Sequence, residues 1–334
     1  MTLPRSYVDG FLIEWEAGEY EAQVRSNRQR SRAIKPVIPA PAGAGGGAAK
    51  SQAARAQAIR ERLQRTIKKV PEVMVKITSS SKGMKQIRAH LDYISRKGQI
   101  DIEDQDGLIT RGKDELKALK ANWRFGGPEE IEETSARRDT INIVFSMPAQ
   151  TDEVAFKRAV RAFARDAFEG HQYVWAYHTQ ATDPDPNPPA HPHVHLSVKV
   201  GGQERRLNPR KADLQKWREG FSEQLRAHGI EANATSRLAR LNKDRGADRT
   251  ILAVQEKGET LHTAGKTPAD GNRTQHARKL EADRVAYYGV LRQTLAQSED
   301  PVDRKLAEDI GTHLVKDHKA LDQAKPRPSP GKER

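Results

Sequence analysis

The sequence predicts an α+β protein: a central antiparallel β-sheet with helices packed on it, plus helical or disordered flanks. Short stretches of alternating polar and apolar residues recur between positions 71 and 200, and this period of two is typical of strands. Longer stretches between them carry apolar residues three and four positions apart, as amphipathic helices do. The last two strand-like stretches are joined by a loop and not by a helix, which indicates an antiparallel pair. We therefore expect helices on one face of an antiparallel sheet.

Each element rests on its own local pattern. In the first helix of the sheet region, Met84, Ile87 and Leu91 share one stripe, and Asp152 is a suitable N-cap for a later helix. The expected strands lie at 73–78, 141–146, 173–178 and 190–200. The expected helices lie at 50–69, 84–97, 113–123, 152–168, 209–229, 275–297 and 301–318.

Composition divides the 334 residues into four segments. Proline and glycine dominate a linker at 36–49, and the last residues combine lysine, arginine and proline with little to bury. The expected segments are a basic N-terminal extension at 1–70 that includes this linker, a compact domain at 71–240, a basic helical region at 241–318 and a disordered basic tail at 319–334.

The overall charge and the absence of cysteine limit the function classes. The formal net charge is +13, from 58 basic and 45 acidic residues, which indicates a polyanionic partner, most often nucleic acid. A soluble protein that is merely basic is the alternative. The sequence has no cysteine, which excludes disulfides, thiol catalysis and cysteine-bound zinc and fits a cytoplasmic location. No apolar run reaches the roughly 20 residues of a membrane span, so we expect no membrane insertion.

Histidines concentrate around the last predicted hairpin. In the strand at 190–200, His193 and His195 fall on the same face, because side chains alternate along a strand. His178 ends the preceding strand, and an antiparallel hairpin brings these ends together. Three neutral imidazoles can hold a divalent cation and leave coordination positions open. The alternative is a group of surface histidines around a proline-rich loop.

The third ligand and the metal are both open at this point. His191 has the same parity as His193, but Pro192 perturbs the backbone between them, so His191 is either a competing ligand or a residue behind the site. Three imidazoles suit manganese or zinc, whereas magnesium prefers oxygen ligands. We expect a divalent metal ion, Mn, Mg or Zn, at His178, His193 and His195.

Tyr93 is a candidate nucleophile for a phosphate substrate. On a helical wheel of about 100° per residue, Tyr93 lies about 140° from the apolar stripe of its helix, so it is not a core residue of that helix. Arg96 and Lys97 follow closely, and cations hold phosphates and favour a phenolate. An exposed tyrosine on an amphipathic helix is the plain alternative.

Two motifs resemble those of a known family. The string His-Leu-Asp-Tyr-Ile-Ser-Arg-Lys-Gly at 90–98 resembles the first motif of conjugative relaxases related to the T-DNA border endonuclease. The string His-Pro-His-Val-His-Leu-Ser-Val at 191–198 is similar to the histidine-rich third motif of these His-hydrophobic-His (HUH) endonucleases. Asn-Ala-Thr-Ser-Arg at 233–237 also resembles a short string of that family. The resemblance spans about 72–240, which makes 71–240 the expected relaxase domain.

The resemblance implies a reaction and its residues. Tyr93 matches the nucleophile, His193 and His195 match the metal pair, and His178 matches the third ligand. The implied activity is site- and strand-specific nicking and rejoining of DNA at an origin of transfer, through a 5′-phosphotyrosyl intermediate, in conjugation or mobilisation. Asp92 and His90 are candidates for the group that takes the tyrosine proton. The expected DNA contacts are Arg96, Lys97, Arg237 and Arg240.

The implied partners are single-stranded or hairpin origin DNA, a relaxosome accessory protein and a type IV coupling protein that reads the tail at 319–334. An ordinary disordered tail is an equal alternative for that segment. The sequence departs from the family pattern at Lys199, where the family often has asparagine, and in the long loop between His178 and His193. Three other functions remain: a replication initiator or transposase of the same class, a non-enzymatic DNA-binding accessory protein, and a phosphoesterase that uses a metal-bound water.

Overall fold

The computed structural model describes residues 2–26, 46–126, 130–185, 188–203, 206–235 and 286–323. The chain divides into two compact units, one at Val70–Ala234 and one formed by Met1–Lys69 together with Thr235–Arg334. The predicted linker lies outside the described residues up to position 45, and positions 46–49 already belong to a helix. Of the predicted tail, 319–323 are helical and 324–334 lie outside the described residues.

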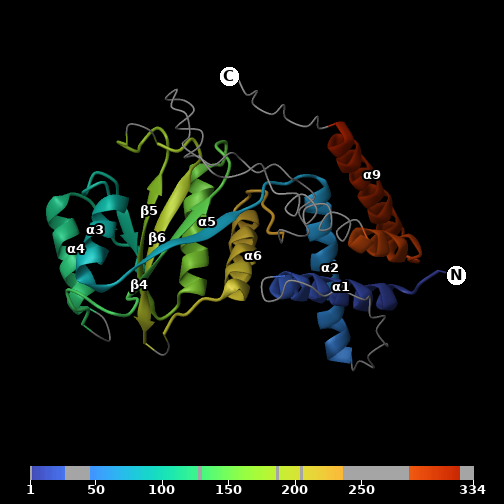
Figure 1. The fold of residues 1–334 in the computed structure, drawn as a ribbon, viewed down its shortest axis with the longest axis horizontal. Helices are drawn as coiled ribbons and strands as arrows, with labels where there is room; N and C mark the ends of the chain where they lie inside the picture. The colour runs from blue at the N-terminus through green and yellow to red at the C-terminus, as the bar shows by residue number, and fades with distance from the viewer. Residues whose placement is uncertain are drawn as a thin grey trace, which may run out of the picture. The chain divides into compact units, whose positions relative to one another are not determined.

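Six antiparallel strands form the sheet of the Val70–Ala234 unit, in the order β1-β4-β6-β5-β2-β3 (Figure 1). The strands are β1 (Met74–Ser81), β2 (Ile102–Asp104), β3 (Ile109–Thr110), β4 (Thr140–Ser146), β5 (His171–His178) and β6 (His193–Gly202). This confirms the predicted α+β class and the antiparallel pairing of the last two strands. The short strands β2 and β3 were not predicted.

Helices cover both faces of this sheet, so the expectation of one covered face is wrong. The helices of this unit are α3 (Gly83–Ile94), α4 (Lys113–Phe125), α5 (Glu153–Ala167) and α6 (Lys211–Ala227). Val174 and Ala176 of β5 are buried with α3 and α4, whereas Trp175 between them is buried with α5 and α6. Figure 1 shows the two helix pairs on opposite sides of the strands. A strand buried on both faces needs apolar residues at successive positions, and β5 has them.

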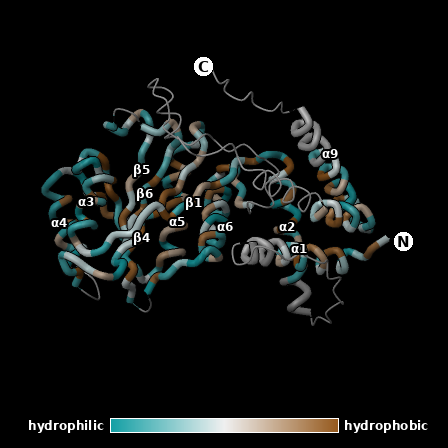
Figure 2. Tube along the Cα trace, viewed as in Figure 1, coloured by the Kyte–Doolittle hydropathy of each residue, from teal (hydrophilic) through white to brown (hydrophobic). Residues whose placement is uncertain are grey.

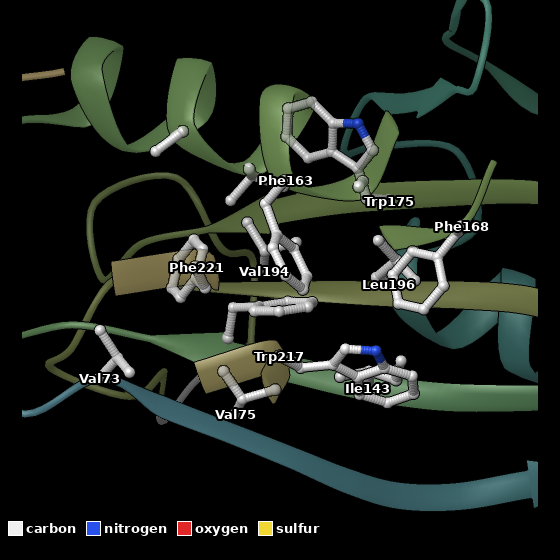
Figure 3. Close-up of a cluster of buried hydrophobic side chains, with 14 of the residues drawn as sticks. Val73, Val75, Ile143, Phe163, Phe168, Trp175, Val194, Leu196, Trp217 and Phe221 are labelled. Carbon is white, nitrogen blue, oxygen red and sulfur yellow. The ribbon is translucent and has the colours of Figure 1, made fainter. Parts of the chain in front are cut away.

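The larger core lies between the sheet and the α5–α6 pair (Figure 3). Phe163 of α5 and Phe221 of α6 meet edge to face, 5.7 Å between ring centroids, in the same cluster as Val194 and Leu196 of β6. The alternation predicted for β6 is therefore confirmed on this side. Asp152 caps α5 by accepting a hydrogen bond from the Ala155 backbone N–H at 2.7 Å. Hydrophobic residues, brown in Figure 2, alternate along these helices with hydrophilic ones, as expected of helices with one buried side.

Two of the differences between predicted and observed bounds lie next to the candidate site. The helix expected at 84–97 ends at Ile94, because the next residues leave helical geometry. The strand expected at 190–200 begins only at His193, since Pro192 has no N–H for the sheet. Instead, the Pro192 carbonyl accepts hydrogen bonds from Met147 N–H and from the Ser146 hydroxyl.

The other unit is helical and draws on both ends of the chain. Its described helices are α1 (Arg5–Ser26), α2 (Gly46–Ile67), α9 (Pro301–Gln323) and a helix at 286–296. Their buried side chains form one cluster: Val8, Leu12, Trp15, Ala56, Ile59, Leu63, Tyr288, Leu291, Leu295, Leu306, Ala307 and Ile310. The predicted N-terminal extension and the predicted C-terminal helical region thus contribute to a common core. Among the described helices, none has the length and apolar character needed to cross a membrane.

Candidate active site

Three histidines gather where β5 ends and β6 begins. The register pairs His178 with His193, and His195 follows two residues later on the same face of β6. Their candidate ligand nitrogens lie within 4.8 Å of one another. A shared ion about 2.1 Å from each nitrogen requires separations of about 3–4 Å, so the rings would have to move closer together to share an ion. His178 is fully buried, and the other two are buried or half-buried.

Hydrogen bonds orient two of the rings. Asp183 accepts from the His178 Nδ1 at 2.7 Å, and the His191 carbonyl accepts from the His193 Nδ1 at 3.0 Å. Bonds of this kind fix the tautomer and leave Nε2 as the nitrogen for a metal. The His178 Nε2 lies 2.8 Å from the Ile94 carbonyl, so binding a metal there requires these two atoms to separate.

Burial favours the neutral form of the three imidazoles. It lowers the pKa of His178, His193 and His195 below the usual value of 6.5. At His195 the neighbouring imidazoles of His178 and His193 lower the pKa further. Metal ligation requires the neutral ring, so the donor chemistry of this set fits a divalent cation. His191 contributes its carbonyl, and its side chain is exposed.

Tyr93 stands beside the histidines on the last turn of α3. Its side chain is 53% exposed, which confirms that it is not a core residue. Its ring meets the His195 ring edge to face, with 5.6 Å between centroids. The buried residues of α3, Met84, Ile87, Leu91 and Ile94, lie on the opposite side of the helix. The candidate nucleophile therefore lies next to the histidine cluster and does not pack in the hydrophobic core.

The residues after Tyr93 form a tight helix terminus. The Ser95 hydroxyl is buried and donates to the Leu91 carbonyl at 2.7 Å. Arg96, Lys97 and Gly98 all have positive φ, at 49°, 57° and 88°. A Cβ on Gly98 would lie 2.6 Å from the Gly112 carbonyl oxygen, so this position requires glycine. The motif thus ends α3 directly after the tyrosine.

The predicted DNA contacts have different surroundings. Lys97 is exposed, whereas the Arg96 side chain is only 13% exposed and is paired with Asp183. This favours a role for Arg96 within the protein over the predicted phosphate contact. Arg237 and Arg240 lie outside the described residues.

The two candidate proton acceptors differ as well. Asp92 accepts a hydrogen bond from Lys120 of α4 at 2.5 Å, which occupies its carboxylate. The His90 ring centroid lies 6.1 Å from that of Tyr93, and its Nε2 is buried with no hydrogen-bond partner in the described part of the chain. Burial lowers the pKa of His90 to about 4, so this ring is neutral at pH 7.

Sequence reasoning missed Asp183. This residue lies in the proline-rich loop after β5, where a turn brings it back because its N–H donates to the Thr179 carbonyl at 3.0 Å. Burial alone would raise the pKa of Asp183, but hydrogen bonds from Arg96 and His178 hold it well below the ordinary value. The available signal was an acidic residue five positions after a candidate ligand, in a loop with no large apolar side chain.

Comparison with known proteins supports the resemblance seen in the motifs. No family model matches the sequence. The chain is 29% identical over 189 residues to the T-DNA border endonuclease VirD2 of Rhizobium radiobacter, which covers 51% of this chain and 43% of that protein. It is 27% identical over 189 residues to VirD2 of Rhizobium rhizogenes, covering 51% and 42%. For VirD2 of Agrobacterium fabrum the identity is 28% over 141 residues, covering 38% and 30%.

The chain spans less than half the length of the curated relatives it matches. A solved structure described as "Molecular Basis of Vancomycin Resistance Transfer in Staphylococcus aureus" matches 50% of this chain and 99% of its own, at 12% identity and a TM-score of 0.32. A similarity of this size supports no conclusion about the fold or the site. The curated matches confirm what the motifs indicated: over half its length, this chain is similar in sequence to the T-DNA border endonucleases.

Proposed function

We propose that this protein is a relaxase: it nicks and rejoins one strand of DNA at an origin of transfer, through a covalent bond between Tyr93 and the DNA. The observation that carries the proposal is the exposed Tyr93 ring 5.6 Å from His195, beside two further imidazoles. The similarity to proteins named T-DNA border endonuclease supports a DNA substrate.

His178, His193 and His195 would hold a divalent metal ion. When bound, the ion would supply positive charge to the non-bridging oxygens of the scissile phosphate. The three neutral rings leave the ion its full charge, and half-buried His195 lies beside the exposed Tyr93 ring. Manganese, magnesium and zinc remain the candidates.

Tyr93 performs the covalent step. Its phenol oxygen attacks phosphorus in line and forms a 5′-phosphotyrosyl bond, while the bond to the 3′-oxygen breaks and that oxygen takes a proton. The reverse attack by a 3′-hydroxyl restores the strand, so no external energy source is needed. Neither candidate proton acceptor is favoured, because Lys120 engages the Asp92 carboxylate and burial lowers the pKa of His90 to about 4, which makes that ring a weak base.

The DNA and its partners follow from the same proposal. Single-stranded or hairpin origin DNA is the expected substrate, and Lys97, Arg237 and Arg240 are proposed phosphate contacts. If they are, the affinity for DNA falls steeply as salt is added. A relaxosome accessory protein, and a type IV coupling protein that reads the tail at 319–334, are proposed partners in conjugation or mobilisation from the cytoplasm.

One gel tests the proposal. Labelled single-stranded DNA that carries the origin of transfer is incubated with the full-length protein and with Mn²⁺, Mg²⁺ or Zn²⁺, and protein-linked label is scored under denaturing conditions. The wild type should form a metal-dependent adduct, and Tyr93→Phe should form none. Cleavage without an adduct, equal in both proteins, would indicate a phosphoesterase that uses a metal-bound water. Metal-independent DNA binding without cleavage would indicate an accessory protein.

A further inference from the structure

A single guanidinium, that of Arg96, joins the two halves of the candidate site. Its Nε and Nη2 donate to the two carboxylate oxygens of Asp183, at 2.8 and 2.9 Å. Its Nη1 donates to the Tyr93 carbonyl at 2.7 Å. The Arg96 guanidinium carbon also lies 4.7 Å from the centroid of the Tyr93 ring. These contacts reach the nucleophile's backbone, its ring and the loop that follows β5.

Asp183 extends this link to the metal ligands. Its side chain is fully buried and accepts from the His178 Nδ1 at 2.7 Å. The same carboxylate oxygen, Oδ2, receives both the Arg96 Nη2 and the His178 Nδ1. Any shift of Arg96 therefore displaces the carboxylate that orients His178.

We propose that Arg96 is a positioning residue that sets the distance between the nucleophile Tyr93 and the metal ligand His178, acting on the ligand through Asp183. This inference rests on the proposed function of the two residues that it positions. It accounts for an arginine that is paired inside the protein three residues after the nucleophile, where a phosphate contact was expected.

The geometry requires arginine at this position. A guanidinium offers parallel donors that match a carboxylate, and a third donor remains for the Tyr93 carbonyl. A lysine ammonium is a point donor on a flexible stem and cannot satisfy both partners in this plane. The left-handed backbone at Arg96, with φ of 49°, turns its side chain back along the end of α3. The end of α3 and the ion pair with Asp183 therefore favour the same position of the Arg96 guanidinium.

The test measures metal affinity and the covalent step separately, with the full-length protein. Mn²⁺ alone is titrated and the free ion is followed by electron paramagnetic resonance. Arg96→Lys and Asp183→Asn should each weaken Mn²⁺ binding about tenfold, the effect typical of losing a hydrogen bond to a metal ligand. The variant with both substitutions should bind Mn²⁺ no more weakly than the single variant of lower affinity. Both substitutions interrupt the same chain of contacts, so their effects do not add. At saturating Mn²⁺, Arg96→Lys should form the adduct with origin DNA more slowly than the wild type does. The reason is that Tyr93 has lost its contacts with the guanidinium of Arg96.

Arg161 provides a matched control. It makes the same two-bond contact with Glu103, at 2.5 and 2.7 Å, and joins α5 to β2 on the other face of the sheet. Arg161→Lys should leave Mn²⁺ affinity and adduct formation unchanged. The proposal is overturned if Arg96→Lys binds Mn²⁺ as the wild type does, or if Arg161→Lys loses as much. If Arg96→Lys does not fold, the Mn²⁺ affinity of Asp183→Asn tests the same chain of contacts, and an affinity equal to that of the wild type overturns the proposal.

The two proposals fail in different ways. A wild type that binds Mn²⁺ at the three histidines but forms no adduct would contradict the relaxase function. A tenfold loss of Mn²⁺ affinity in Asp183→Asn and Arg96→Lys would still support the link to His178 in that case. Normal adduct formation with unchanged Mn²⁺ affinity in both variants would contradict the role of Arg96 alone.

Discussion

The Tyr93 ring lies edge-on to the His195 ring, at an interplanar angle of 80°. Tyr93 comes from the end of α3, and His195 comes from the start of β6, an interior strand of the sheet. Neither ring belongs to a hydrophobic core cluster, so packing alone does not explain why they meet. Their contact brings a phenol to a set of three neutral imidazoles, which is the arrangement that a metal-assisted attack on a phosphate requires.

The identity of the third metal ligand can be tested with two alanine substitutions. His178→Ala should weaken Mn²⁺ binding at least a hundredfold, because one of three nitrogen donors is lost. His191→Ala should have little effect, since His191 acts through its backbone carbonyl. Isothermal titration with Mn²⁺ measures both. Equal losses in the two variants, or a larger loss in His191→Ala, would show that the loop places His191 in the coordination sphere.

Because of Lys199, the free energy of unfolding should increase as the pH rises from neutral to alkaline values. It is 3% exposed, and its Nζ has no hydrogen-bond partner within the described ranges, although it lies 5.6 Å from the Trp123 ring centroid. Burial lowers its pKa from 10.5 to about 8. Lys199 therefore binds its proton more tightly in the unfolded chain than in the folded protein. Burial of the charged ammonium lowers the free energy of unfolding by its full amount below pH 8, and this loss disappears as the pH rises towards 10.5.

Replacement of this buried cation should stabilise the protein. Lys199→Met should raise the free energy of unfolding at pH 7 by up to about 3 kcal/mol, less the lost contact with Trp123. The gain should shrink as the pH rises above 8. Urea denaturation at several pH values measures this difference. A gain that does not change between neutral and alkaline pH would contradict the explanation by charge burial.

Arg60 should be essential to the helical unit. It is 1% exposed and bonds Asp9 of α1 at 2.6 Å and Asp303 of α9 at 2.6 and 3.0 Å. Arg60→Ala leaves two buried carboxylates without their cation, which typically costs about 3–5 kcal/mol. Hydrogen exchange should accelerate together in α1, α2 and α9. Arg55→Ala is the control, because Arg55 is 58% exposed and lies 3.8 Å from Glu16; exchange as slow in Arg60→Ala as in this control would refute the prediction.

Local patterns were sufficient to predict much of the site. Alternation along 190–200 placed His193 and His195 on the face opposite Val194 and Leu196, and the core contacts of β6 confirm that parity. The apolar spacing of α3 predicted that Tyr93 faces away from the core, and its exposure confirms this. Both patterns follow from the periodicity of a single strand or helix, which can be recognised in a short stretch of sequence.

Contacts between distant segments were not predictable in this way. Asp183 reaches His178 only because the loop after β5 turns back, and hydrogen bonds of the Thr179 region determine that turn. The helical unit is formed by residues from both ends of the chain, so no local window contains its pattern. The strands β2 and β3 have three and two residues, too few for a period of two to be recognised.

The most direct measurement identifies the amino acid that carries the DNA. The full-length protein is incubated with Mn²⁺ and single-stranded DNA that carries the origin of transfer, the adduct is digested with nuclease and trypsin, and the peptides are analysed by mass spectrometry. Trypsin cuts after Arg88 and Arg96, so Tyr93 lies in the peptide 89–96. The account predicts a nucleotide phosphate on Tyr93 in that peptide. A nucleotide on any other residue, or cleaved DNA with no modified peptide, would contradict it.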